Sequence, residues 1–339
     1  MLVGDSGYGV RLSTRDGSPA RLPGARSLLI GAAVAGLTLY AIQPAWWADP
    51  VEGVRRFLAS NLSRSATKPI PTWYLGRPYA FALPWHNTIV LTFATTPLSV
   101  LLLAAVGGID ALRRRRVEPW ALIWPLSWAT LMVVRALPNA PGHDGIRLFL
   151  PSVASLGVLA AMGVGAIARR RPKAALLALA LALGESGLGI TRVYPYTDSY
   201  YSVAVGGLPG AEKLGLELTY YWDAMGPEFL RWLRIEAARR PVSLRFPGPL
   251  INVRFLREWG WIPPGVRVLD IEPAPDPDYV LQRRRGVYYP YDEWLDARGQ
   301  PRFTIAREGV DLLRVYPFSE SFRAYEATRG VPIPEHLRN

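Results

Sequence analysis

The 339-residue sequence has no cysteine and only three histidines. The lack of cysteine excludes disulfide frameworks, thiolate metal sites and thiol catalysis. His86, His143 and His336 are widely spaced, which disfavours a metal centre that needs several histidines. Acidic residues are fewer than basic ones, 27 against 39, so the formal net charge is +12.

The excess positive charge and the long apolar runs occupy the same part of the chain. Residues 1–193 carry the entire excess, whereas residues 194–339 hold equal numbers of acidic and basic side chains. Basic residues that flank apolar runs are typical of membrane topology signals rather than of nucleic-acid binding. We therefore expect an integral membrane protein that contacts membrane lipid and has no nucleic-acid partner.

Apolar segments in this part predict a multi-pass α-helical membrane domain over residues 27–193 with about five transmembrane helices. The segments are residues 27–42, 89–109, 120–137, 148–168 and 174–191. A bilayer core of ~30 Å needs about 20 helical residues, which the second and fourth segments supply without flanking residues. A core helix of a soluble protein is the alternative for any one segment. Pro97, Pro125 and Pro151 fall inside these runs, where membrane helices tolerate proline better than soluble ones.

Two features inside the apolar runs leave alternatives open. Gly157, Ala161 and Gly165 have the spacing that lets membrane helices approach closely, but a composition rich in glycine and alanine explains them equally well. Glu185 lies in the fifth run, where a charge indicates a functional residue by default. Because Glu185 is near the end of that run, where it can reach water, we favour a structural role.

The arginine-rich stretches predict the orientation. Residues 1–26, 113–116 and 169–173 alternate with the expected helices, so all three can face the cytoplasm. Residues 44–87 and 138–146 then lie outside, as does everything after residue 191. We expect residues 1–26 to form a disordered cytoplasmic tail.

Residues 194–339 are expected to form a small extracytoplasmic α/β domain. Short apolar or alternating runs predict strands at residues 242–246, 266–271, 279–283 and 312–316. Residues 211–240 are expected to be rich in helix, with a second helix that begins at Pro227, and residues 252–259 are expected to be helical as well.

A short outer loop places His143, Asp144 and Arg147 at the mouth of the fourth helix. An arginine can bind a phosphate through two hydrogen bonds, and a histidine can offer a switchable one. The alternative is a solvated turn in which Arg147 extends its charge to the membrane surface.

The outer loop over residues 44–87 mixes aromatic side chains with a few donors. Tyr74, Trp85 and His86 suit stacking on a sugar or an isoprenoid chain, and an aromatic belt that anchors the helices is the alternative. Asp276 and Asp278 have the D-x-D form that some glycosyltransferases use to hold a metal ion, but they lie in a Pro-rich loop. No metal-binding residue is assigned, and a divalent metal is left open.

Several short motifs occur in a set order along the chain. They are residues 67–76 (TKPIPTWYLG), 83–88 (LPWHNT), 143–151 (HDGIRLFLP), 194–196 (YPY), 199–201 (SYY), 206–211 (GGLPGA), 219–222 (TYYW), 279–282 (YVLQ) and 308–310 (EGV). In this order the chain resembles the C-terminal half of bacterial family 39 glycosyltransferases. These belong with the protein mannosyltransferases and aminoarabinose transferases in the C-type glycosyltransferase superfamily.

The resemblance implies a multi-pass enzyme of the bacterial inner membrane that moves a sugar from polyprenyl phosphate to an extracytoplasmic acceptor. It implies that His143 and Arg147 bind the donor phosphate, and that Tyr74, Trp85 and His86 contact the sugar or the lipid. It implies no further cofactor.

The chain departs from the family at the catalytic carboxylate, which lies in the first outer loop of those enzymes. Here that loop offers only Asp49 and Glu52, outside the family's motif. We therefore expect a part of the enzyme without its N-terminal catalytic loop, either truncated or completed by a separately encoded N-terminal half, and the catalytic residue is unknown. The alternative is a non-catalytic membrane protein that anchors an outer binding domain or partners a separate catalytic subunit.

Overall fold

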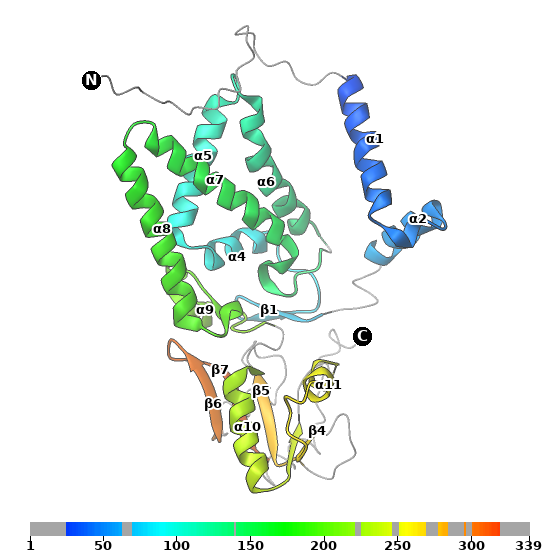
Figure 1. Cartoon of the computed structure of the whole chain (residues 1–339), viewed down its shortest axis with the longest axis vertical. Helices are drawn as coiled ribbons and strands as arrows, with labels where there is room; N and C mark the ends of the chain where they lie inside the picture. The colour runs from blue at the N-terminus through cyan, green and yellow to red at the C-terminus, as the bar shows by residue number, and fades with distance from the viewer. Residues whose placement is uncertain are drawn as a thin grey trace, which may run out of the picture.

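The computed structural model describes residues 25–62, 70–138, 140–220, 225–245, 251–268, 277–283, 295 and 300–318. A helical region stands above a small sheet region (Figure 1). The helices of the helical region are α1 (Ala25–Ala41), α2 (Pro50–Leu62), α4 (Asn87–Thr95), α5 (Leu98–Arg114), α6 (Ile123–Ala136), α7 (Leu150–Ala168), α8 (Pro172–Val193) and α9 (Gly207–Lys213). The expected tail over residues 1–26 lies outside the described residues except for Ala25 and Arg26, which begin α1.

Two helices are long and apolar enough to cross a membrane. One is α7 together with the 3₁₀ turn η3 (Gly145–Phe149), which gives 24 residues, and the other is α8 with 22 residues. At about 1.5 Å per residue each exceeds the ~30 Å of a bilayer core. These helices indicate association with a membrane, and they match the fourth and fifth apolar segments.

The expected set of five spans is not confirmed. The second apolar segment is not one straight helix, because α4 and α5 meet at a bend of 120°. Pro97 forces the preceding Thr96 into an extended conformation (φ −105°, ψ 133°), which ends α4. The third segment gives α6 with 14 residues after the 3₁₀ turn η2 (Pro119–Leu122), and α1 has 17 residues. Within the described residues the long apolar spans number two, or three if α4 and α5 count as one.

Glu185 caps the helix that begins after this break. Its Oε1 accepts a hydrogen bond from the Leu98 N–H (2.8 Å), and its Oε2 accepts bonds from the Ser99 N–H (2.9 Å) and the Ser99 hydroxyl (2.5 Å). The first N–H groups of a helix have no partner within the helix, and their partial positive charge favours a carboxylate. The structural role that we favoured for Glu185 is therefore the one that the structure supports.

Helices α5 and α7 pack with their backbones in close approach. A Cβ atom added to Gly107 would lie 1.9 Å from the carbonyl oxygen of Leu159, and one added to Gly163 would lie 2.0 Å from that of Leu103. Gly157 and Gly165 would meet nothing within 4 Å. The close contact therefore runs along Leu159 and Gly163, not along the Gly157 and Gly165 stripe that the sequence had suggested.

The two arginine-rich loops lie together at the end of the helices that is far from the sheet (Figure 1). Asp110 of α5 pairs with Arg114 in its own helix at 2.9 Å, and also with Arg169 at the end of α7. The C-terminal ends of α5 and α7, which the charge pattern assigned to the same side of the membrane, are thus linked by ion pairs to Asp110.

The loop over residues 44–87 contains helix α2 and a hairpin of β1 (Thr72–Tyr74) and β2 (Arg77–Tyr79). Tryptophans after α1 hold α2 close to it. Trp46 meets Phe57 edge-on at 5.9 Å between ring centroids, and the Trp47 indole donates a hydrogen bond to the Tyr40 carbonyl at 3.0 Å. These two tryptophans therefore tie the end of α1 to α2.

The sheet region has five strands in the order β4-β3-β5-β7-β6. Its elements are α10 (Pro227–Arg239), β3 (Val242–Arg245), α11 (Ile251–Glu258), β4 (Val266–Val268), β5 (Tyr279–Arg283), β6 (Phe303–Arg307) and β7 (Val310–Pro317). Strand β3 is parallel to β4 and β5, whereas β7 is antiparallel to β5 and β6. Strands lie at all four predicted places, although residues 246 and 269–271 of those predictions lie outside the described residues. The helices predicted from Pro227 and over residues 252–259 are present, whereas the helix-rich stretch expected from Ala211 is wrong, because α9 ends at Lys213. Strand β6 was not predicted.

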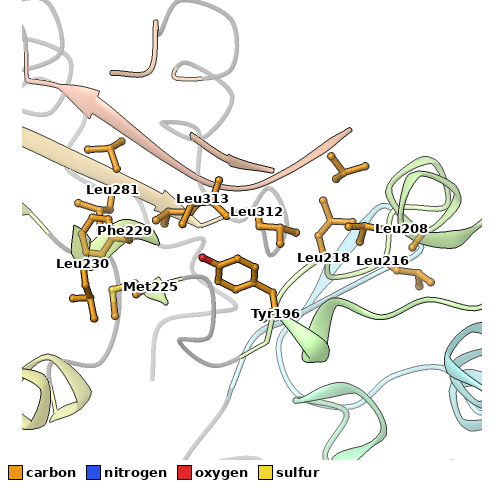
Figure 2. Packing of buried hydrophobic residues seen from close by; sticks show 14 of the residues in the cluster. Tyr196, Leu208, Leu216, Leu218, Met225, Phe229, Leu230, Leu281, Leu312 and Leu313 are labelled. Carbon is orange, nitrogen blue, oxygen red and sulfur yellow. The ribbon is translucent and has the colours of Figure 1, made fainter. Parts of the chain in front are cut away.

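One hydrophobic core joins the sheet-facing ends of the helices to the sheet. Buried Leu91 of α4 and Met132 of α6 belong to the same cluster as Leu313 of β7. Figure 2 shows Tyr196 in this cluster, between leucines of β7 and those of the segment that holds Leu216 and Leu218. The helical region and the sheet region are therefore packed against each other, although the sequence places a boundary near residue 194.

The close approach of α5 and α7 predicts that Gly163→Ala lowers stability. A methyl group there meets the backbone of Leu103, which cannot move aside as a flexible side chain can, and overpacking of this kind costs about 1–3 kcal/mol. Gly165→Ala is the matched control, since it adds the same methyl to the same helix in open space. Thermal unfolding of the detergent-solubilised protein should show a lower Tm only for Gly163→Ala. Equal Tm values would contradict the packing.

The cap on α5 predicts that Glu185→Ala destabilises the protein. The substitution leaves the N–H groups of Leu98 and Ser99 without this acceptor, and unsatisfied buried donors cost about 1–3 kcal/mol. Ser186→Ala is the control, because the Ser186 hydroxyl bonds only to the Ala182 carbonyl of its own helix in α8. Thermal unfolding compares the two variants, and the cap is refuted if Glu185→Ala melts no lower than Ser186→Ala.

Candidate functional site

The candidate site lies where the sheet-facing ends of α4 and α7 meet the β1–β2 hairpin (Figure 1). Two contacts bring the loop before α7 to the segment before α4. The Gly142 N–H donates to the Phe81 carbonyl at 2.9 Å, and Ala82 forms an isolated antiparallel bridge with Pro141. Arg135 of α6 also donates to the Pro141 carbonyl. The two loops that carry the predicted site residues are therefore neighbours.

The β1–β2 hairpin is held by a tight turn. Leu75 (φ 49°) and Gly76 (φ 75°) both have left-handed conformations, which suits a two-residue hairpin turn. The Gly76 N–H donates to the Gly215 carbonyl at 2.9 Å. A Cβ atom on Gly215 would lie 2.3 Å from the Gly76 nitrogen, so this contact requires glycine at residue 215.

Tyr74, Trp85 and His86 form one contact group. The Tyr74 hydroxyl and Nδ1 of His86 are hydrogen-bonded at 2.8 Å, and the Trp85 ring meets the His86 ring edge-on at 5.7 Å. Tyr74 is only 1% exposed, whereas Trp85 is 68% exposed. Burial, with a smaller contribution from Tyr79, raises the pKa of Tyr74 to about 12. Tyr74 therefore orients His86 as a neutral phenol, and Trp85 offers the accessible ring.

Asp144 stands between the two residues predicted to bind phosphate. Its Oδ2 lies 3.7 Å from Nε2 of His143 and 3.4 Å from Nη1 of Arg147. Asp144 (φ 64°) and Gly145 (φ 57°) are both left-handed, and a Cβ atom on Gly145 would lie 2.7 Å from the Tyr220 ring. His143 is 3% exposed, whereas the Arg147 side chain is 61% exposed. Arg147 is therefore the member of this group that a ligand can reach.

A buried carboxylate at this site was not predicted from the sequence. Glu217 is 2% exposed, and its Oε1 accepts a hydrogen bond from the Trp73 N–H at 3.2 Å. Its backbone carbonyl accepts one from the Tyr201 hydroxyl at 2.5 Å, and that hydroxyl lies 3.1 Å from the Tyr220 hydroxyl. Burial, and then the neighbouring Tyr220, raise the pKa of Tyr201 well above its usual value. A charged residue between Leu216 and Leu218 was the only signal in the sequence.

The groups around Tyr74 and Glu217 line a cavity of about 10 Å³, to which Gly142 and Gly145 also contribute. This volume is close to the space that one water molecule requires. A sugar ring or a lipid phosphate does not fit inside it. Ligand contact in this conformation is therefore restricted to the exposed side chains, above all Trp85 and Arg147.

The D-x-D motif does not present two available carboxylates. Asp278 binds within the sheet region, where Oδ2 accepts the Ser243 N–H at 2.7 Å and Oδ1 accepts Arg240 at 2.5 Å. Burial opposes ionisation of Asp278, but the hydrogen bonds from Ser243 and Arg240 outweigh it and lower its pKa. Asp276 lies outside the described residues. Among the residues that are described, no group of three acidic or histidine side chains could hold a metal ion.

Comparisons with known proteins identify no relative. No family model matches the chain, no curated protein matches it, and no solved structure matches it. The resemblance to family 39 glycosyltransferases therefore stays a prediction, which is carried by the motifs alone.

The raised pKa of Tyr74 predicts how it titrates. A phenol with a pKa of about 12 is only about one-tenth ionised at about pH 11, where an ordinary tyrosine is largely ionised. Tyrosinate absorbance near pH 11 should therefore be nearly the same for the native protein and for Tyr74→Phe. A loss of one full tyrosinate equivalent in the variant would show that Tyr74 is not shielded.

The same variant tests the hydrogen bond to His86. Tyr74→Phe should also lower the free energy of unfolding by about 1 kcal/mol, the net contribution of one hydrogen bond. Tyr79→Phe is the control, because it removes a hydroxyl from the neighbouring ring of the same hairpin, 6.2 Å away between centroids.

Proposed function

We propose that the chain is part of an integral-membrane glycosyltransferase that moves a sugar from a polyprenyl-phosphate donor to an extracytoplasmic acceptor. The position of Arg147 carries this proposal. Arg147 lies in the 3₁₀ turn that continues directly into the span formed by α7, and its side chain is 61% exposed. A guanidinium at the end of a membrane-spanning helix lies at the depth where the phosphate groups of lipids are found.

The ion pair between Arg147 and Asp144 can be exchanged for a contact with a phosphate. The pair, at 3.4 Å, is exposed on the arginine side, and pairs of this kind contribute about 0–1 kcal/mol. A phosphate offers the planar guanidinium two strong charge-assisted hydrogen bonds. The exposed Trp85 ring supplies an apolar face for the sugar or the isoprenoid, and Tyr74 fixes His86 beside it.

The catalytic base is not assigned to this chain. In the outer loop, Asp49 accepts the Glu52 N–H at 2.9 Å, and Glu52 binds Arg55 and Arg56 at 2.6 and 2.7 Å. Hydrogen bonds from both arginines lower the pKa of Glu52 to about 2, which makes it a poor proton acceptor at neutral pH. The proposal therefore includes a partner that supplies the acidic residue, as a separately encoded N-terminal half would.

We further propose that the protein lies in the bacterial inner membrane with α1 and α6 as additional spans, which makes five in all. The joined ends of α5 and α7, which carry Arg114 and Arg169, would face the cytoplasm under the positive-inside rule. The sheet region, at the opposite end of the helices, would then be extracytoplasmic (Figure 1).

A second candidate function is a non-catalytic membrane protein that anchors the sheet region or partners a catalytic subunit. The burial of Tyr74 and His143, and the single-water size of the cavity beside Tyr74, favour this alternative. Under it, these residues serve only to fix the hairpin on the helices.

Binding of a polyprenyl-phosphate sugar to the purified, detergent-solubilised chain separates the two functions. We expect saturable binding that Arg147→Ala weakens about tenfold or more, since about 1.4 kcal/mol corresponds to a factor of ten. Arg77→Ala is the control, because Arg77 is an exposed arginine of β2 in the same hairpin that carries Tyr74. It should change the affinity less than twofold.

Two results would remove the glycosyltransferase proposal in favour of the anchoring function. One is the absence of saturable binding by the native chain. The other is equal loss of binding in Arg147→Ala and Arg77→Ala.

A further inference from the structure

A second cavity, of about 350 Å³, lies along the sheet-facing half of α8. Its walls come from α8, from the segment Tyr200 to Val203, and from the turn between β6 and β7. None of the five predicted site residues lines it. Its volume is in the range of sites that hold small ligands.

The wall of this cavity that α8 forms is apolar, and its leucine side chains are exposed on the surface of the protein. Leu181 and Leu188 line it and are each about three-fifths exposed. Gly184 lies between them, and a Cβ atom there would meet nothing within 4 Å. Because α8 is long and apolar enough to cross a membrane, we expect this surface to contact lipid chains, and the absence of a side chain at Gly184 leaves room for one of them.

The far end of the cavity carries both signs of charge. Arg192, in the last turn of α8, has Nη1 4.0 Å from Oε1 of Glu308 in the β6–β7 turn. The other Glu308 oxygen, Oε2, accepts the Leu208 N–H at 3.1 Å, which holds the carboxylate in place. A separation of 4.0 Å is too long for a strong charge-assisted bond, so both groups can bind elsewhere.

The charged side chains that line the cavity indicate which lipid headgroup it can bind. Glu185 also lines the cavity, so its charged side chains at neutral pH are those of one arginine and two glutamates. An anionic headgroup would meet a net negative surface, whereas a headgroup with both signs can match Arg192 and Glu308 together. A primary ammonium has three N–H donors for a carboxylate, and a quaternary ammonium has none.

We propose that this cavity binds a zwitterionic glycerophospholipid with a primary amine headgroup, of the phosphatidylethanolamine type. One acyl chain lies against α8 at Gly184, the phosphate accepts hydrogen bonds from Arg192, and the ammonium donates to Glu308. Because Arg192 belongs to the helical region and Glu308 to the sheet region, the bound lipid bridges the two.

Native mass spectrometry of the detergent-purified full chain tests this site. The probes are dioleoyl phosphatidylethanolamine, phosphatidylcholine and phosphatidylglycerol, offered in equal amounts. We expect one phosphatidylethanolamine to be retained about tenfold in preference to the other two, as one matched ion pair can provide. Equal retention of the three lipids, or a preference for phosphatidylglycerol, would overturn the proposal.

A pair of variants tests the acyl-chain part of the site. Gly184→Leu fills the part of the cavity beside α8 and should reduce the retention of phosphatidylethanolamine about tenfold. Gly187→Leu makes the same change three residues away on the same helix, at a residue that does not line the cavity and where an added Cβ atom meets nothing within 4 Å. It should retain the lipid within about twofold of the native chain. An equal loss of phosphatidylethanolamine retention in both variants would mean that the lipid does not bind in this cavity.

Glu308→Gln tests the headgroup part independently of the acyl-chain part. The amide oxygen can still accept the Leu208 N–H, so the turn is preserved while its negative charge is removed. The preference for phosphatidylethanolamine over phosphatidylglycerol should then fall to about twofold or less. A preference that survives this substitution in a folded variant would also overturn the proposal.

Discussion

The helical region depends on the carboxylate of Glu185, which caps the first turn of α5 after the bend at Pro97. Pro97 turns the chain by 120°, and the N–H groups that begin α5 have no partner within their own helix. Glu185 accepts from both Leu98 and Ser99, and so links α8 to the start of α5. With that cap in place, α4 can run across the end of the bundle, and His86 at its first turn reaches Tyr74.

A second constraint fixes the sheet to the end of α8. Arg307, at the end of β6, donates to the Tyr194 carbonyl at 3.0 Å and places its guanidinium 4.8 Å from the centre of the Tyr196 ring. It also pairs with Glu228 of α10. One side chain thereby joins the last turn beyond the membrane helix, the hydrophobic core and the sheet region. Glu308 follows it directly in a left-handed conformation (φ 48°), so its carboxylate is directed to the helical region as well.

The sequence was sufficient where local pattern decides the structure. The apolar runs of α7 and α8 and strand β5 were predicted closely, because hydropathy and alternation are properties of neighbouring residues. The bend at Pro97 was not predicted. Hydropathy averages neighbouring residues, so it carries no information about Glu185, which caps α5 from 87 positions away. The loops with Tyr74 and His143 were chosen from the sequence as carriers of the site, and the structure places them side by side. The hydrogen bond of Tyr74 to His86 and the burial of Glu217 arise only from tertiary packing.

The two proposed lipid sites share an arginine–carboxylate pair but differ in net charge. In each, an arginine at the end of a membrane helix keeps a loose pair with a carboxylate, Arg147 with Asp144 at 3.4 Å and Arg192 with Glu308 at 4.0 Å. A loose, partly exposed pair costs little to exchange for a phosphate. What differs is the remaining charge, because Glu185 adds a second carboxylate to the lining of the cavity that holds Arg192. The first site can therefore accept a phosphate alone, whereas the second needs a cation on the same ligand.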